Sequence, residues 1–145
     1  MAAIHSQLSA DCIVLGRFSL CHLLLMNDSS YPWFILVPDR EDIREIYQLD
    51  TADREQLLHE SCRLSEFLMS AFEGEKLNVA ALGNQVPQLH LHHIVRYAKD
   101  PAWPTPVWGR FPARPYNDQA LSEIRLKFNS AGLAGYQPVA ESYLA

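Results

Sequence analysis

The chain has 145 residues, of which 48% are hydrophobic and 20% are charged, and its formal net charge is −5. This length suits one ordinary domain with its own core, and the composition excludes wholesale disorder and fibrous repeats. The negative charge gives no general attraction to nucleic acid, so we expect no DNA partner and a local site for any phosphate ligand.

The three cysteines, Cys12, Cys21 and Cys62, are odd in number and lie far apart in apolar surroundings. This pattern argues against both a disulfide framework and a paired-cysteine metal site. No leader-like segment opens the chain and no run of about 18 apolar residues occurs, so we expect no membrane partner. These features together predict a cytoplasmic protein.

Three apolar runs in the first third of the chain predict strands, at residues 12–15, 21–26 and 33–37. Gly16 breaks the first run from the second, and turn residues at 27–30 separate the second from the third. An antiparallel meander is therefore expected. Pro38 should end the third strand, because proline cannot donate to a sheet ladder.

Helices are predicted in the middle and near the end of the chain. The clearer one runs from Thr51 to about Phe72, where apolar side chains recur every three or four residues on one stripe. A shorter helix is predicted at 117–130, and one or two helical turns at 41–49. Five prolines at 101–115 predict an extended segment that docks on the surface.

Two further strands, at 77–82 and 88–97, flank a short glycine-containing turn. The expected fold is α+β, with an antiparallel five-stranded sheet, one long helix and a C-terminal helix. We expect one domain over residues 1–145, with its core at about 12–97. Residues 98–145 would form a proline-rich extension and the last helix.

Three of the six histidines lie within four residues, in the run QLHLHH that begins at Gln88. In a strand, Gln88, His90 and His92 would point to one face, with about 6.6 Å between neighbours. Two imidazoles and an amide would then line one wall. His93 would point to the opposite face, where a structural role is the simpler expectation.

Three interpretations fit this cluster. The first is a solvent-edge strand whose histidines only form hydrogen bonds. The second is a zinc or iron site at His90 and His92, although no adjacent cysteine or acidic residue completes the ligand set. The third makes one imidazole a nucleophile toward phosphorus and its neighbour a donor to the phosphate oxygens. An imidazole with an ordinary pKa of about 6.5 is largely neutral at pH 7, so its free nitrogen is available.

The order of predicted elements, the run from Asn78 to Asn84 and the QLHLHH run resemble the histidine-triad (HIT) family, whose motif is His-φ-His-φ-His-φ-φ with φ apolar. The resemblance covers about residues 12–97, including the run FILVP from Phe34. It implies a HIT-like fold, a homodimer, and hydrolysis or nucleotidyl transfer at an α-phosphate. The implied substrates are purine nucleotides or dinucleotides, such as diadenosine polyphosphate, and nucleoside phosphoramidates. No cofactor is implied.

Residue by residue, the resemblance places the catalytic positions of the family in this run. The middle histidine, which becomes nucleotidylated, corresponds to His90, and the third, which donates to the α-phosphate, corresponds to His92. The first position is Gln88, and an amide cannot shuttle a proton as imidazole can. Two alternatives to an enzyme therefore stay open: a non-catalytic nucleotide-binding module and a histidine-rich metal-binding protein.

The resemblance also implies nucleotide-binding residues. At each of these positions, an ordinary role in a turn is an equally good explanation for the residue type. They are Asn27 at the ribose, Asn78 before the motif, and Asn84 and Gln85 near the phosphate. Arg96 lies on the catalytic face of a regular strand and could help neutralise phosphate, with a surface salt bridge as the equal alternative.

Overall fold

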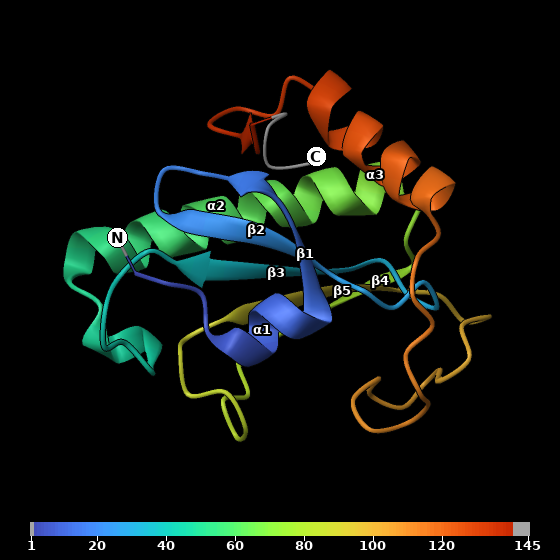
Figure 1. The fold of residues 1–145 in the computed structure, drawn as a ribbon, viewed down its shortest axis with the longest axis horizontal. Coiled ribbons are helices and arrows are strands. Elements are labelled where there is room, and N and C mark those ends of the chain that lie inside the picture. The colour runs from blue at the N-terminus through green and yellow to red at the C-terminus, as the bar shows by residue number, and fades with distance from the viewer. Residues whose placement is uncertain (1, 141–145) are drawn as a thin grey trace.

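The computed structural model describes residues 2–140 and contains one sheet with helices on both of its faces (Figure 1). Its elements in chain order are α1 (Ser6–Asp11), β1 (Cys12–Arg17), β2 (Cys21–Met26), β3 (Trp33–Pro38), the 3-10 helix η1 (Ile46–Gln48), α2 (Thr51–Ala71), β4 (Lys76–Ala80), β5 (Leu91–Arg96), α3 (Asp118–Ser130) and β6 (Gln137–Pro138). Among these described residues, no helix is long and apolar enough to cross a membrane.

The sheet has six strands in the order β4-β5-β3-β2-β1-β6, and each neighbouring pair is antiparallel. The predicted meander of β1, β2 and β3 is confirmed, but the predicted count of five strands is wrong. The additional strand, β6, pairs with Gly16 and Arg17. Gly16 allows this pairing, because a Cβ atom there would lie 2.3 Å from the carbonyl oxygen of Gln137. Gly16 therefore lies inside β1 and does not end it.

The central strand β3 is buried along its whole length, because both of its faces are covered. Phe34 and Leu36 point into the apolar cluster beneath α2 and α3, whereas Trp33, Ile35 and Val37 point into a second cluster on the other face. This alternation follows the two-residue period of a strand. The sheet thus separates a helix-covered face from the face that carries the site.

Helices α2 and α3 cover the first face. Asp50 caps α2 by accepting a hydrogen bond from the backbone of Asp53, at 2.8 Å. The apolar stripe predicted for this helix packs on the sheet through residues such as Leu64 and Leu68, which are fully buried. The ring of Phe128 from α3 lies 5.3 Å from that of Phe34, so the predicted C-terminal helix closes the same core.

The second face is covered by α1 and by the segment at 101–115, and α1 lies on the side of the sheet opposite to α2 (Figure 1). The sequence patterns did not predict α1, which is six residues long and buries only Leu8. The predicted strand at 88–97 is also shorter than expected. Its first residues leave the sheet ladder because the backbone N–H of Leu89 donates to the carbonyl of Ile43 at 2.9 Å.

Candidate active site

His90 lies directly before β5, and its side chain is buried with only a small exposed fraction. Its Nδ1 is 2.7 Å from the backbone carbonyl oxygen of Gln88. A carbonyl oxygen can only accept, so Nδ1 carries the proton in this hydrogen bond. The neutral ring therefore has its lone pair on Nε2, which is the atom required of a nucleophile.

His92, the second residue of β5, has the opposite tautomer. Its Nδ1 lies 2.9 Å from Nε1 of Trp33, and an indole nitrogen can only donate. The lone pair of His92 is thus on Nδ1, and its Nε2 carries the proton. Burial, together with the smaller electrostatic effect of His90 and His93, lowers the pKa of His92 to about 3. His92 is therefore a neutral hydrogen-bond donor at pH 7.

The two rings have centroids 4.9 Å apart and line one cavity of about 350 Å³, which we call the histidine pocket. Its other walls are α1, the loop at residues 82–86 and Trp108. Trp108 packs edge-on against His92, with ring centroids 5.2 Å apart. One imidazole with its lone pair on Nε2 and one with its proton on Nε2 thus line the same cavity.

A second cavity of about 390 Å³ adjoins the histidine pocket and shares Asp11, Met26, Trp108 and Gly109 with it. Asn27 lines this second cavity. We call these two adjoining cavities together the groove, of which the histidines line one part and Asn27 the other.

The structure brings some of the predicted nucleotide-binding residues to this groove. Asn84 and Gln85 line the histidine pocket, in the loop where Gly83 has a φ of +76°. Asn27 lies in the adjoining cavity, where its Oδ1 accepts a hydrogen bond from the backbone of Tyr116 at 2.9 Å. The side-chain nitrogen of Asn27 is then the group left to meet a ligand.

Asn78 does not line the histidine pocket. Its Oδ1 accepts a hydrogen bond from Nη1 of Arg96 at 2.9 Å. Arg96 is buried and also donates to both carboxylate oxygens of Asp100 and to the carbonyl of Thr105. Because these partners occupy the guanidinium, Arg96 docks the proline-rich segment and is neither a phosphate ligand nor a surface ion pair.

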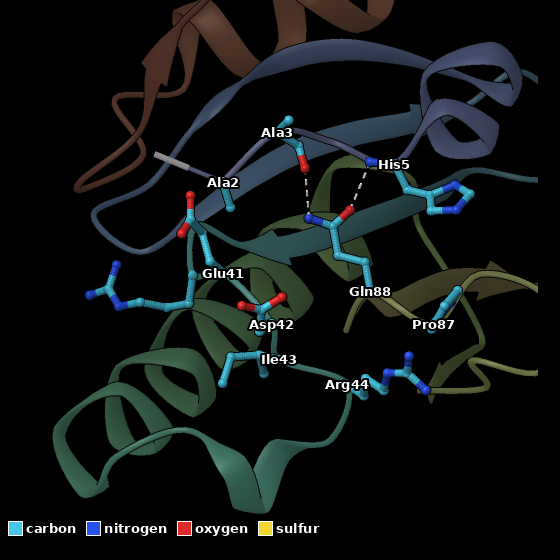
Figure 2. Close-up of a pocket in the computed structure, with 10 residues that line it drawn as sticks. Ala2, Ala3, His5, Glu41, Asp42, Ile43, Arg44, Pro87 and Gln88 are labelled. Carbon is cyan, nitrogen blue, oxygen red and sulfur yellow. Dashed lines mark hydrogen bonds between the residues drawn. The ribbon is translucent and has the colours of Figure 1, made fainter.

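Gln88 also departs from its predicted position. It does not line the histidine pocket, and its side-chain amide binds the backbone of residues 3 and 5 (Figure 2). The predicted wall of two imidazoles and one amide therefore consists of the two imidazoles only. The reason is local, because the strand that would have placed all three side chains on one face begins only at Leu91.

His93 points to the opposite face of the sheet, as predicted, and is fully buried. Its Nδ1 donates to the carbonyl of Leu91 at 3.0 Å, and its Nε2 accepts from the hydroxyl of Ser61 in α2 at 2.7 Å. Burial lowers the pKa of His93 to about 4, although its backbone hydrogen bonds favour the charged ring. His93 thus links the sheet to α2 and takes no part in the pocket.

The stability of the fold should fall in acid because of His93. An unfolded histidine has a pKa of about 6.5, whereas that of folded His93 is about 4, so the unfolded chain binds more protons between these values. The free energy of unfolding should therefore decrease as the pH falls from about 6.5 toward 4, by up to about 1.4 kcal/mol per pH unit. Urea denaturation at a series of pH values measures this slope. His92, whose pKa is lowered to about 3, adds a slope of its own over this range, so His93→Gln should reduce the slope without abolishing it. An unchanged slope in that variant would assign the whole effect to other groups.

Two features of the pocket had not been predicted from the sequence. Trp33, which fixes the tautomer of His92, lies 59 residues before it in the chain. Gln7 and Leu8 of α1 line the pocket, although they lie more than 80 residues before the histidines. No local motif marks these residues, because their role depends on contacts between distant segments.

Among the described residues, no group of three His, Cys, Asp or Glu side chains could hold a metal ion.

The fold and the pocket define an α+β protein with two histidines in one cavity whose hydrogen bonds select opposite tautomers. A family model described as the HIT domain matches residues 7–99. The chain therefore belongs to the histidine-triad (HIT) family. This membership supports a nucleotide-binding hydrolase or transferase.

Solved structures of histidine triad proteins are similar to this chain. One from Marinobacter aquaeolei VT8 is 52% identical, with a TM-score of 0.89, and the match covers 92% of this chain and 99% of the other. One from Bradyrhizobium japonicum is 40% identical, with a TM-score of 0.87 and coverage of 88% and 96%. One from Sinorhizobium meliloti 1021 is 39% identical, with a TM-score of 0.86 and coverage of 88% and 95%. A comparison with curated proteins gives no match.

Proposed function

We propose that the protein hydrolyses or transfers nucleotidyl groups at the α-phosphate of dinucleoside polyphosphates or nucleoside phosphoramidates, through a covalent intermediate on His90. The observation that carries this proposal is the pair of opposite tautomers in the histidine pocket. A nucleophile needs a free lone pair, and a phosphate oxygen needs a donor. His90 and His92 meet these two needs without a general base to activate them.

The reaction has two steps. Nε2 of His90 attacks the α-phosphorus, a P–N bond forms, and the bond from phosphorus to the leaving group breaks with its electron pair going to that group. Water then attacks the phosphorus and loses a proton to solvent, the P–N bond breaks with its electron pair returning to Nε2 of His90, and the mononucleotide is released. His92 and backbone N–H groups of the Gly83 turn stabilise the charge on the phosphate oxygens in both steps.

The rest of the groove supports a nucleotide as the occupant. Nε1 of Trp108 is buried and has no hydrogen-bond partner among the described residues, so an acceptor on a bound ligand would satisfy it. Asn27 lines the cavity that adjoins the histidine pocket, where the nucleoside would lie. Cys12, Cys21 and Cys62 are free thiols, which agrees with the cytoplasmic location that we propose.

A turnover assay on protein purified without an affinity tag tests this function. A fluorogenic adenosine phosphoramidate and diadenosine tetraphosphate serve as substrates, and metal analysis is done on the same sample. Turnover of either substrate without bound metal supports the proposal. Binding of AMP without turnover of either substrate would identify a non-catalytic nucleotide-binding module, and stoichiometric zinc or iron would identify a metal protein.

The proposal includes a homodimer, formed through the free edge of the sheet at β4. This strand pairs only with β5 among the described elements. Val79 within the strand is 47% exposed, and Leu82 just after it is 46% exposed. A free edge with exposed apolar side chains favours pairing with a second copy about a two-fold axis. Light scattering with a chelator present should give a dimer mass, which Val79→Lys should reduce to that of a monomer.

Leu126→Lys is the matched control for the dimer, because Leu126 is an exposed leucine of α3 and should leave the mass unchanged. A monomer mass for the unmodified protein at micromolar concentration would overturn the dimer. Loss of the dimer only on chelation would favour the metal interpretation.

A further inference from the structure

The side-chain amide of Gln88 holds the segment that precedes α1. Its Oε1 accepts a hydrogen bond from the backbone N–H of His5 at 2.8 Å, and its Nε2 donates to the carbonyl of Ala3 at 2.9 Å (Figure 2). A side-chain amide presents the same donor and acceptor as a peptide group, so it pairs with both backbone groups at once. These contacts join residues that lie 83 and 85 positions apart.

The segment held in this way continues into a wall of the histidine pocket. We call residues 2–11 the N-terminal arm. His5 caps α1 by accepting a hydrogen bond from the backbone of Gln7 at 3.0 Å. Gln7 and Leu8 then line the histidine pocket, and Leu8 is buried in the same apolar cluster as Val86 of the opposite loop. A displaced arm would open the pocket on this side.

A second contact fixes the start of the arm. The backbone N–H of Ala2 donates to Oδ1 of Asp39, directly after β3, at 2.7 Å. The arm is thus attached at Asp39, at Gln88, through Leu8, and at its end, where the backbone N–H of Asn27 donates to the carbonyl of Asp11 at 3.0 Å. Among these attachments, Gln88 lies two residues before His90 in the chain.

We propose that Gln88 is a positioning residue that holds the N-terminal arm as a wall of the nucleotide pocket. The residue in the first position of the family motif therefore acts on nucleotide affinity and not on proton transfer in the chemical step. That the pocket binds a nucleotide rests on the proposed function. That Gln88 holds the arm rests only on the two hydrogen bonds to Ala3 and His5.

Imidazole would not replace the amide in this role. The two ring nitrogens of a neutral histidine carry one donor and one acceptor, but these point away from each other. One ring cannot therefore serve both Ala3 and His5 as the amide does. Gln88→His, which would restore the family motif, should release the arm as Gln88→Ala does.

The test compares Gln88→Ala and Gln88→His with the unmodified protein in two measurements. Hydrogen exchange at the backbone amide of His5 should become about tenfold faster, because its acceptor is lost. The Kd for AMP and the KM should both rise about tenfold, while kcat stays within about twofold. Gln119→Ala is the matched control, since Gln119 is exposed on α3 and, among the described residues, its side chain bonds only to Glu123.

Gln88→Glu provides a variant that keeps the acceptor for His5 and loses the donor to Ala3, so its effects should be intermediate. Unchanged exchange at His5 in Gln88→Ala would overturn the attachment. Unchanged affinity for AMP, or a fall in kcat at constant KM, would overturn the positioning role and place Gln88 in the chemical step. If the protein turned over neither substrate, the proposed function would fail, and His5 exchange and AMP affinity would still decide the role of Gln88.

Discussion

Replacing His90 with alanine is expected to lower kcat by on the order of 10³-fold or more, because binding energy alone cannot replace a missing nucleophile. The methyl group of alanine leaves no atom in the pocket that can form a bond to phosphorus. The pocket walls, His92 and the Gly83 loop stay in place, so the Kd for AMP should change little. Steady-state kinetics and calorimetric titration with AMP measure the two quantities.

A matched control and a direct observation sharpen this test. His59→Ala removes an exposed histidine of α2 and should leave kcat unchanged. Rapid quenching of the unmodified protein followed by mass spectrometry should find the nucleotidyl group on the peptide that contains His90. Retention of more than about a tenth of the activity in His90→Ala would show that His90 is not the nucleophile.

The sequence was sufficient to predict the parts of the fold that have strong local patterns. The apolar stripe of α2 has the period of a helix, and apolar runs mark the strands β1, β2 and β3. In these segments the tertiary contacts agree with the structure that the local pattern predicts. Six-residue α1 and two-residue β6 are too short to show a period. Their positions depend on contacts with distant residues, such as Gln88 for the segment before α1 and Gly16 for β6.

The site divides in the same way. His90 and His92 lie two residues apart, so the spacing alone brought them into one pocket. The failures concern side chains whose partners come from elsewhere in the chain. Arg96 was expected on the catalytic face, but Asp100, Asn78 and Thr105 take up its donors. Asp100 is only four residues from Arg96, but Asn78 is 18 residues away, and a single sequence contains no signal for a pairing that depends on how two separate segments pack.

The second large effect is expected at His92. His92→Phe keeps an aromatic ring between Trp33 and Trp108 but removes the N–H that we propose as the donor to the phosphate oxygen. Loss of one such donor typically costs about 10²-fold to 10³-fold in kcat, and we expect a loss in this range. Trp33→Phe should cost about tenfold, because His92 would then be free to place its proton on Nδ1 instead of Nε2.

Trp33 acts only through His92 in this account, and a double-mutant cycle tests that dependence. Once His92 is phenylalanine, no imidazole remains for Trp33 to orient, so adding Trp33→Phe should lower kcat by less than about twofold more. Nitrogen NMR of the histidine rings provides an independent readout, since Trp33→Phe should change the tautomer of His92 and leave that of His93 unchanged. Additive effects on kcat, or an unchanged His92 tautomer in Trp33→Phe, would show that the indole only fills space, and the donor role of His92 would then need another origin.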